Sequence, residues 1–367
     1  MKATLYRADL RYPHLQLYTA SSGSIAVLEE LYLLLEDKAI TGLGEVRLNI
    51  AYLNGYSAEL VLSDVIRTLR TLDLQQTPSA LLLSLEQQLA DSLAPTRMLF
   101  DMALHDLIAH QNGCSVARLI GADFPQPVCY SSNQTLFWTS QERMLSQATD
   151  YMERGFNQLK LRVGIGSLHE DMDRLSALRR RFGSEVHLSA DANGQWQPEQ
   201  ARSNLLALQK FELSYLEQPI ADSHAHYYPQ LADSSPIPLM LDESMSSEGD
   251  LERILAMEGK VWAHIKLVKM GGIAPAIRAA QRLNSAGIPF MIGQMNEGAA
   301  ATAAALHVAY ASQPAHAELY GADGLGNDPV SGLTYFQGLV HSRDASGLGI
   351  EFDASRAELI QTFPSLT

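Results

Sequence analysis

From about residue 126 onward, the chain repeats one pattern with a period of about 25 residues. Each repeat contains a short apolar run, a polar or charged residue near its end, and a segment whose apolar residues have helical spacing. The apolar runs are PVCYSS, QLKLRV, VHLSADANG, LSYLEQPI, IPLMLDES, WAHIKLVKMGG, IPFMIGQMNEG and HAELYG. Alternating strands and helices are typical of a parallel sheet. An open doubly wound sheet is one solution, but eight evenly spaced units favour a closed (β/α)₈ barrel, an α/β fold.

The sequence before this repeat has a different texture. Residues 3–12 and 24–47 are predicted to form strands, with turns at residues 21–23 and 41–44. Helical segments follow and end with the long segment 94–121. We therefore predict a separate α+β domain before the barrel, and a strand-like tail after the barrel. The predicted parts are residues 1–125, 126–330 and 331–367, the last of which completes the barrel and packs on the first.

The composition and charge of the chain indicate which classes of binding partner to expect. Hydrophobic residues make up 46% of the chain and charged residues 19%, enough to fill a sizeable core. The formal net charge is −14 and no run rich in Lys or Arg occurs, so we expect neither nucleic acid nor an anionic membrane surface as a partner. No apolar run approaches the ~20 residues of a membrane span. Cys114 and Cys129 lack metal-ligand spacing, and no signal peptide is recognised, so we expect free thiols and a cytoplasmic protein.

Three consecutive apolar runs place an acid near their C-terminal ends: Asp191, Glu217 and Asp242. In a (β/α)₈ barrel these strand ends form the active site, so the three carboxylates are expected to converge there. Carboxylates so close together raise one another's pKa unless a cation balances them. Three oxygen-donating side chains suit Mg²⁺, with water or substrate completing the octahedron, and Mn²⁺ is the alternative. The spacing therefore predicts a magnesium site.

Cationic residues lie on either side of these acids in the predicted strand order. Lys160 and Arg162 belong to the second run, and Lys266 belongs to the sixth. Residues two apart on a strand point to the same side, about 6.6 Å from each other, so Lys160 and Arg162 aim in one direction. Two unit charges at that distance repel by about 2.5 kcal/mol at an effective dielectric constant of about 20. We therefore expect Arg162 to lower the pKa of Lys160.

These motifs together resemble the enolase superfamily, and within it the muconate-lactonizing-enzyme-like subgroup of the mandelate racemase/muconate lactonizing enzyme family. The matching residues are KLR at 160–162, DAN at 191–193, EQP at 217–219, DES at 242–244 and IKLVKMGG at 265–272. The resemblance implies a modified barrel with an α+β capping domain, and Mg²⁺ bound by the three acids. It also implies that Asn193 and Glu243 support those acids from behind. The mandelate-racemase-like subgroup would need a histidine base on the seventh strand, where this chain has GQMNEG.

Similarity to this superfamily implies one type of chemistry. A substrate carboxylate chelates the metal, a base removes the α-proton, and the negative charge moves onto the carboxylate oxygens as an enediolate. The metal and the nearby cations stabilise that enediolate more than they stabilise the ground state. We therefore expect a small carboxylate-bearing substrate, and we also expect a homo-oligomer.

Arg162 departs from the subgroup, which has Lys-x-Lys on the second strand. A guanidinium is not deprotonated near neutral pH, so Arg162 is expected to clamp the substrate while Lys266 acts as the base on one face. One base favours elimination, and we expect a dehydratase or other lyase acting on a small hydroxy or amino acid. A racemase, epimerase or cycloisomerase of the same superfamily is the first alternative, with Lys160 reaching the second face. The second alternative is a Schiff-base aldolase that uses Lys266, or a non-catalytic relative that binds a carboxylate ligand.

Further residues are candidates for contacts with the substrate. Glu297 and Glu318 lie at mouth positions of the seventh and eighth runs. Tyr18 and Tyr52 lie in YTASSGS and YLNGYS, which match the positions of the family's two specificity loops. The run ELYG, which begins at Glu318, replaces the Asp-x-Asp of dipeptide-epimerase relatives and argues against that substrate class. His264, two residues before the lysine of the sixth run, is expected to be a hydrogen-bonded wall residue.

Overall fold

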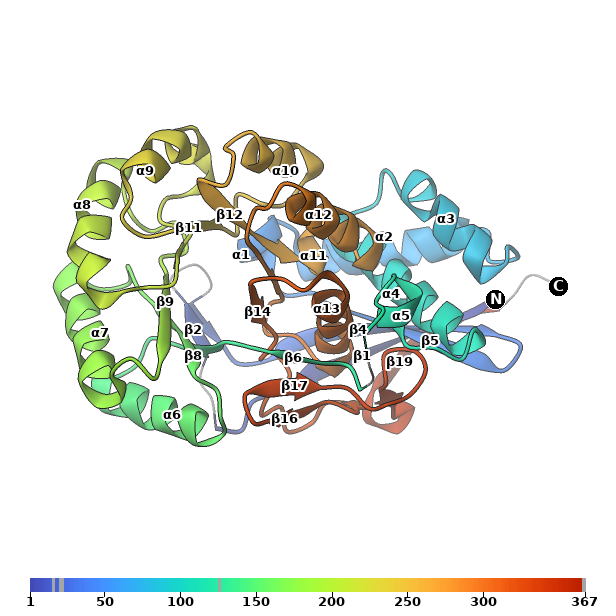
Figure 1. The fold of residues 1–367 in the computed structure, drawn as a ribbon. Helices are drawn as coiled ribbons and strands as arrows, with labels where there is room; N and C mark the ends of the chain where they lie inside the picture. Colours follow the sequence, from blue (N-terminus) through green and yellow to red (C-terminus); the bar gives the residue numbers. More distant parts are fainter. Residues whose placement is uncertain (15–16, 20–22, 125–126, 365–367) are drawn as a thin grey trace.

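The computed structural model describes residues 1–14, 17–19, 23–124 and 127–364. Within these ranges, eight parallel strands form one sheet in chain order, with helices on its outer side (Figure 1). The backbone N–H of Asn133, just before the first strand, donates to the carbonyl oxygen of Ala317 in the last at 2.9 Å. This bond links the two ends of the sheet, and the predicted (β/α)₈ barrel is confirmed. The strands are β7 (Gln134–Leu136), β8 (Gln158–Arg162), β9 (His187–Asp191), β10 (Leu216–Glu217), β11 (Leu239–Leu241), β12 (Val261–Lys266), β13 (Phe290–Gly293) and β14 (His316–Glu318).

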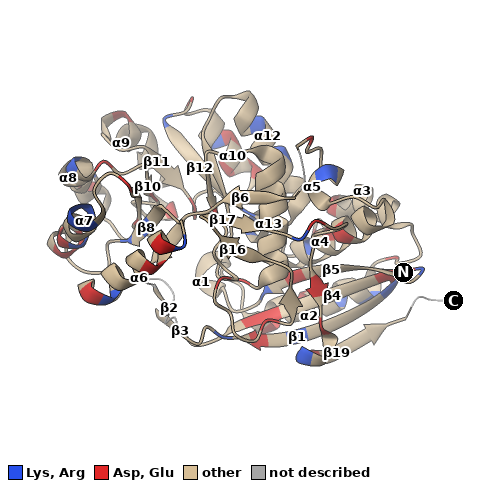
Figure 2. Cartoon of the chain, turned by 60° about the horizontal axis from the view of Figure 1, so that its bottom comes forward, with Lys and Arg blue, Asp and Glu red and all other residues tan. Residues whose placement is uncertain are grey.

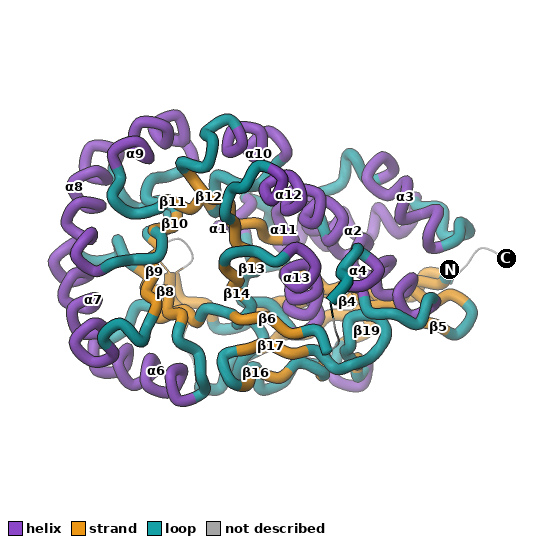
Figure 3. The backbone as a smooth tube through the Cα atoms, viewed as in Figure 1, coloured by secondary structure: helices purple, strands orange, loops and turns teal. Residues whose placement is uncertain are grey.

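A layer of helices surrounds these strands (Figure 3). In α7, the Ser167 hydroxyl accepts from the Glu170 backbone N–H while the Glu170 carboxylate accepts from the Ser167 N–H, which fixes the start of the helix. Acids lie in the first turn of α7 and arginines in its last turn, and this arrangement complements the helix dipole. Figure 2 shows both signs of charge on α7. The layer and its connections contain α6 (Gln141–Glu153), α7 (Leu168–Phe182), α8 (Pro198–Leu208), η1 (Gln209–Phe211), η2 (Asp222–Tyr227), α9 (Tyr228–Ser234), α10 (Glu248–Leu255), α11 (Leu267–Met270), α12 (Ile273–Ser285) and α13 (Ala299–Ser312).

Alternation along the strands decides which side chains enter the barrel. In β8, Leu159 and Leu161 belong to the main hydrophobic core, whereas Lys160 and Arg162 point to the other side of the strand. By the same alternation, the last residues of β9 and β12, Asp191 and Lys266, point into the barrel. A smaller apolar cluster, separate from the main core, is formed by Tyr215, Met240 and Met291 with Trp262 packed against it. Alternation thus collects the polar ends of the strands at one mouth of the barrel.

The prediction that the run PVCYSS forms the first strand of the barrel is wrong. The run PVCYSS instead contains β6 (Cys129–Ser131), which pairs with β17 (Leu339–His341) in a different sheet. The barrel begins with β7, whose residues are buried, whereas those of β6 are half-buried. The run does form a strand, but its partner comes from the far end of the chain, and local sequence does not reveal that partner.

A four-stranded antiparallel sheet lies beside the barrel, in the order β19–β1–β4–β5 (Figure 1). The helix α4 (Ala94–Gln111) packs closely on β5, because a Cβ on Gly44 would lie only 2.0 Å from the carbonyl oxygen of Leu99. The turn predicted at residues 41–44 is therefore wrong: Lys38 and Ala39, both with positive φ, make the turn, and the later glycines allow close packing. The strands are β1 (Lys2–Leu10), β4 (Leu28–Asp37), β5 (Ile40–Arg47) and β19 (Glu358–Phe363).

The rest of the N-terminal part is helical, apart from the short antiparallel pair β2 and β3. The turn predicted between them at residues 21–23 lies largely outside the described residues. Among the helices of the described ranges, none has the length and apolar character needed to span a membrane. The remaining elements of this part are β2 (Leu17–Thr19), β3 (Gly23–Ile25), α1 (Ala51–Asn54), α2 (Ala58–Thr71), α3 (Pro78–Gln88), α4 (Ala94–Gln111) and α5 (Val116–Leu119).

The segment after residue 330 contacts several parts of the fold. β17 pairs with both β6 and β16, β15 pairs with β18, and β19 pairs with β1 of the N-terminal sheet. The boundaries of the three parts, at residues 125 and 330, remain predictions. The elements of this segment are β15 (Val330–Ser331), β16 (Thr334–Phe336), β18 (Glu351–Phe352) and η3 (Ala354–Arg356), besides β17 and β19.

Buried acids lie where the N-terminal sheet meets the barrel. Glu45 of β5 accepts from the backbone N–H groups of Gly298 and Ala301, both at 2.8 Å, and so caps α13. Glu30 of β4 is fully buried, and neither of its carboxylate oxygens has a hydrogen-bond partner among the described residues. Burial, and then the neighbouring Glu45 and Glu297, raise the pKa of Glu30 well above its usual value. The folded state therefore keeps a proton on Glu30 at pH values where the unfolded chain has released it.

We expect Glu30→Gln to remove a pH dependence of stability. Because folding raises the pKa of Glu30, its contribution is complete below the pKa of the unfolded chain and is lost as the pH rises through the folded pKa. Between the pKa of the unfolded chain and the raised pKa of the folded protein, the unmodified protein should lose stability relative to Glu30→Gln, by about 1.4 kcal/mol for each unit by which folding raises the pKa. Thermal melts across this range measure the difference. Glu36→Gln, on the exposed end of the same strand, should behave like the unmodified protein, and an unchanged profile in Glu30→Gln would contradict the assignment.

Candidate active site

Lys160 and Arg162 of β8 both reach acids on neighbouring strands. Lys160 Nζ lies 2.8 Å from Glu217 Oε2 and 3.7 Å from Asp191 Oδ2. It also forms an ion pair with Glu318 of β14. Arg162 forms an ion pair with Asp191. The two side chains therefore point in one direction, as their spacing predicts, and meet carboxylates from three other strands.

Arg162 acts on the pKa of Lys160 in the expected direction, but the expected net fall in that pKa is wrong. Burial favours the neutral amine and Arg162 repels the ammonium, but Glu217, Glu318 and Asp191 outweigh both effects and raise the pKa well above its usual value. Local sequence shows only the charge on the same strand. In the folded protein, the closest charges of opposite sign come from strands that are distant in sequence.

The three predicted metal ligands lie at the ends of adjacent strands and are buried. Asp191 and Glu217 are the last residues of β9 and β10, and Asp242 directly follows β11. Lys266 Nζ lies 2.7 Å from Asp242 Oδ2, and Lys269 Nζ lies 2.5 Å from Asp242 Oδ1. Burial opposes ionisation of Asp242, yet these two ammoniums hold its pKa well below the usual range. For Asp191 and Glu217, burial prevails over the neighbouring cations and raises the pKa.

Lys266 ends β12, which lies four strands from β8 in the eight-strand order of the described sheet. Its side chain is buried, and besides Asp242 it contacts Met295 Sδ at 3.5 Å. Burial favours the neutral amine, but Asp242 and then Glu318 raise the pKa of Lys266 above its usual value. Lys266 and the cations of β8 therefore face the acids from opposite sides of the barrel.

A cavity of about 30 Å³ lies at this end of the barrel, and its lining shows which candidate residues are accessible to a small molecule. Arg162, Lys266 and Glu318 line it from three barrel strands, and Tyr52 lines it from the N-terminal part. Lys160 is fully buried and lies outside this lining. Substrate contacts are therefore available to the arginine of β8 more directly than to its lysine.

Two of the predicted substrate contacts lie elsewhere. Tyr18 is 40% exposed and lines a separate cavity of about 490 Å³, together with Trp138 and Arg143. Glu297 is buried outside the lining of the small cavity, and its Oε2 accepts from the Met295 backbone N–H at 3.1 Å. Position in a loop or after a strand does not by itself fix the direction of a side chain, which is why the sequence does not separate these residues from the others.

Asn193 and Glu243 lie directly beside the acids. The Asn193 backbone N–H donates to Asp191 Oδ1 at 2.8 Å, and Arg162 donates to Asn193 Oδ1 at 2.8 Å. The Asn193 amide also donates to Glu243 Oε1 at 3.4 Å. Burial, and then Asp242 and Asp191, raise the pKa of Glu243 to about 8. Asn193 thus links Arg162 of β8 and Asp191 of β9 to Glu243, which lies just after β11.

Two residues of the site were not predicted from the sequence. Lys269 lies about one helical turn after Lys266, in the short helix α11, and its side chain contacts Asp242. Gln218 accepts from the backbone N–H groups of Asp242 and Ser244 at 3.0 and 3.3 Å, and so holds the end of β11. Both lie within the motifs IKLVKMGG and EQP. A lysine or glutamine just beyond a strand usually reads as a surface residue, so only the fold reveals their direction.

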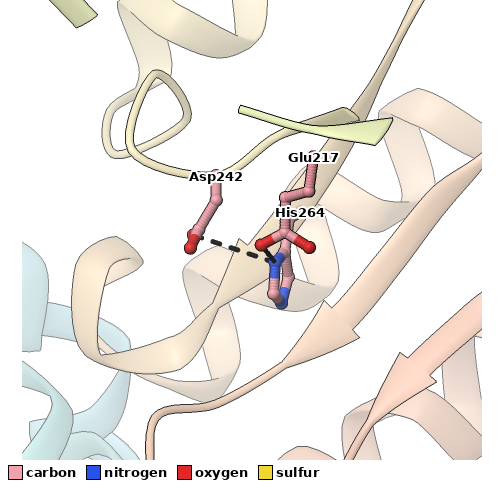
Figure 4. Close-up of side chains that lie close together, drawn as sticks. All are labelled: Glu217, Asp242 and His264. Atoms are coloured by element: carbon pink, nitrogen blue, oxygen red, sulfur yellow. Dashed lines mark hydrogen bonds and ion pairs between the residues drawn. The ribbon is translucent and has the colours of Figure 1, made fainter. Parts of the chain in front are cut away.

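The residues present fit a divalent cation. Figure 4 shows Glu217, Asp242 and His264 pointing toward one another, and one donor atom of each lies within 4.8 Å of the others. Asp191 lies outside this group but shares Lys160 with Glu217. Burial, and then Lys266, hold the pKa of His264 well below its usual value, so it brings no positive charge. Buried carboxylates at the ends of neighbouring strands, with their oxygens close together, are the donor set that a hard cation requires.

The fold and the site together define a (β/α)₈-barrel enzyme in which lysines of opposite strands flank a buried carboxylate cluster. The chain belongs to the enolase superfamily, because a family model described as Enolase C-terminal domain-like matches residues 143–356. The resemblance read from the sequence motifs is thereby confirmed.

Curated relatives of this chain carry names of one reaction type. N-succinyl-L-Arg/Lys racemase of Bacillus cereus is 26% identical over 100% of both chains. L-Ala-D/L-Glu epimerase of Clostridium acetobutylicum is 31% identical over 68% of this chain and 70% of its own length. These relatives are isomerases, which favours the racemase or epimerase alternative over the lyase expected from the sequence.

Solved structures show the same fold. The dipeptide epimerase of Cytophaga hutchinsonii, complexed with Mg and the dipeptide D-Ala-L-Val, aligns with a TM-score of 0.87 at 22% identity, covering 98% of each chain. Muconate lactonizing enzyme of Pseudomonas fluorescens aligns with a TM-score of 0.89 at 22% identity, covering 96% of each chain. The capped barrel is therefore shared with magnesium-binding and muconate-lactonizing members of the superfamily.

Proposed function

We propose that this protein is a metal-dependent racemase or epimerase that removes and returns the α-proton of an amino-acid derivative with a free carboxylate. The observation that carries the proposal is the placement of Lys160 and Lys266 on β8 and β12, on opposite sides of the three buried acids. Inversion at a carbon needs proton transfer on both of its faces, and these strands flank the site from both sides. The names of the relatives support this reaction rather than β-elimination.

Asp191, Glu217 and Asp242 would hold Mg²⁺, with Mn²⁺ as the alternative. A divalent ion bound there would balance the negative charge of the carboxylates that keep Lys266 protonated. It would also stabilise the negative charge on the substrate carboxylate. Lys266, which lines the cavity, then takes the α-proton on one face. Because Asp242 contacts both Lys266 and Lys269, it also fixes the direction of the base.

Arg162 acts as a fixed cation. Burial opposes its charge, but Asp191 outweighs burial, and the pKa of the guanidinium stays well above its usual value. It lines the cavity and is held by Asp191 and Asn193, so it orients the substrate carboxylate and does not accept a proton. Lys160, buried behind it, is the titratable group of the second face. Proton transfer on that face is therefore slower than on the Lys266 face.

The stereochemical course in deuterated water tests this assignment. A single enantiomer of each N-acyl amino acid or dipeptide in a substrate screen should exchange its α-proton and invert, with exchange faster than inversion when that proton faces Lys266. Lys160→Met should abolish inversion and leave exchange on the Lys266 face, whereas Arg162→Lys should raise inversion relative to exchange. Chiral chromatography and mass spectrometry measure both quantities. Release of an unsaturated acid without inversion would instead support the lyase.

A further inference from the structure

His264 belongs to the site, but the proposed function does not use it. It lies on β12 two residues before Lys266, so its ring enters the barrel one layer below the lysine. The side chain is fully buried. Its Nδ1 lies 3.0 Å from Glu217 Oε1 and 3.8 Å from Asp242 Oδ1 (Figure 4). Without an ion, Nδ1–H donates to Glu217 Oε1, so ligation through Nδ1 would require the ring proton to move to Nε2.

The next strand provides the space for this ring. Gly293 of β13 pairs with Lys266 in the sheet register, and a Cβ at Gly293 would lie 2.1 Å from His264 Nε2. His264 Nε2 has no hydrogen-bond partner among the described residues. Packing thus holds the ring with a single nitrogen engaged, and that nitrogen faces the acids.

The carboxylate oxygens divide into two sets according to what they face. Glu217 Oε2 lies 2.8 Å from Lys160, whereas Glu217 Oε1 faces His264. Asp242 Oδ2 pairs with Lys266, whereas Asp242 Oδ1 is the oxygen nearest to His264. The two oxygens that face the histidine form, with its Nδ1, a compact set of three donor atoms.

The separations within this set suit ligands of one ion. Ligands about 2.1 Å from a metal and roughly 90° to 120° apart lie about 3.0 to 3.6 Å from one another. The two distances from His264 Nδ1, 3.0 and 3.8 Å, are close to that range. Lys269 Nζ shares Asp242 Oδ1, but it also donates to the backbone carbonyls of Asp242 and His264. It therefore keeps partners when that oxygen binds an ion.

We propose that Glu217 Oε1, Asp242 Oδ1 and His264 Nδ1 form a mixed nitrogen–oxygen metal site that selects a first-row transition ion such as Co²⁺ or Zn²⁺ over Mg²⁺. Mg²⁺ takes oxygen ligands, whereas an imidazole nitrogen strengthens binding of the later divalent ions. The catalytic meaning of this preference rests on the proposed function, but the binding itself does not. This donor set shares Glu217 and Asp242 with the three-carboxylate site.

The first test uses the unmodified protein, stripped with chelator and titrated with Co²⁺ alone. Ligation by a histidine should give a hyperfine-shifted, exchangeable imidazole N–H resonance in the proton NMR spectrum. A spectrum of the Co²⁺-bound protein without that resonance would overturn the proposal, because an all-oxygen site produces none.

The second test compares ions in variants. In His264→Asn, Co²⁺ binding should weaken by about 10- to 100-fold, while Mg²⁺ binding changes by less than about threefold. Equal losses for both ions would overturn the proposal, because they would mean that His264 only orients Glu217. His264→Gln, checked by circular dichroism, repeats the comparison if the asparagine variant folds poorly. His316→Asn, a histidine of β14 stacked on Trp262, is the matched control and should leave Co²⁺ binding unchanged.

These experiments distinguish a failure of the mixed-donor metal site from a failure of the proposed function. The titrations contain no substrate, so a protein that binds Co²⁺ through His264 but exchanges no α-proton contradicts only the proposed function. A protein that exchanges α-protons with Mg²⁺ and gives identical ion preferences with and without His264 contradicts only the mixed-donor site.

Discussion

Lys266→Ala is expected to lower the rate of α-proton exchange by about 10²- to 10⁴-fold, the usual contribution of a positioned general base. The ammonium lines the cavity at the end of β12 and is aimed by its contact with Asp242. Alanine removes the base and leaves the acids and Arg162 in place, so binding of a carboxylate ligand should persist. Hydrogen–deuterium exchange into a substrate, followed by mass spectrometry, measures the loss.

Lys260→Ala is the matched control for this experiment. Lys260 directly precedes the opposite end of the same strand and pairs with Asp233 at an exposed site. Its removal should leave exchange unchanged. Normal exchange in Lys266→Ala would transfer the role of principal base to Lys160.

Asp242→Asn is expected to weaken metal binding and abolish turnover while the fold persists. The carboxylate is one of the three proposed ligands, and it also balances the ammoniums of Lys266 and Lys269. An amide leaves two buried cations without their shared anion, and removal of one partner from a buried pair costs about 3–5 kcal/mol. The variant should therefore melt at a lower temperature, and calorimetric titration should show weaker binding of Mg²⁺.

The exposed pair of the same residue types again supplies a control. Asp233→Asn removes the partner of Lys260 on the surface and should affect neither metal binding nor turnover. Full activity of the unmodified protein in excess chelator would contradict the metal requirement.

The sequence predicted the site residues that depend on strand periodicity. Asp191, Glu217 and Asp242 were identifiable because one period of strand and helix returns each strand end to the same mouth of the barrel. Lys160 and Lys266 were identifiable because alternation turns them inward from buried strands. Local sequence contains both kinds of regularity, so no knowledge of tertiary contacts was needed.

Features that depend on contacts between distant segments were not predictable. The strand in PVCYSS lies outside the barrel because its partner is β17, and Glu297 faces buried acids of the N-terminal sheet instead of the small cavity. The pKa of Lys160 rises because Glu217 and Glu318 approach it from other strands. In each case the deciding neighbour lies tens or hundreds of residues away, where no local pattern reports it.

The pairing of β1 with β19 has a consequence for synthesis of the chain. Ala3 lies opposite Phe363, so the N-terminal strand emerges from the ribosome long before its partner exists. Until then β1 has one open edge, which is a template for pairing with other chains. Domains generally fold as they emerge, but this sheet is complete only when translation has passed residue 363. Every residue of the site is therefore made before the last strand of the N-terminal sheet, β19, is available to cover that edge.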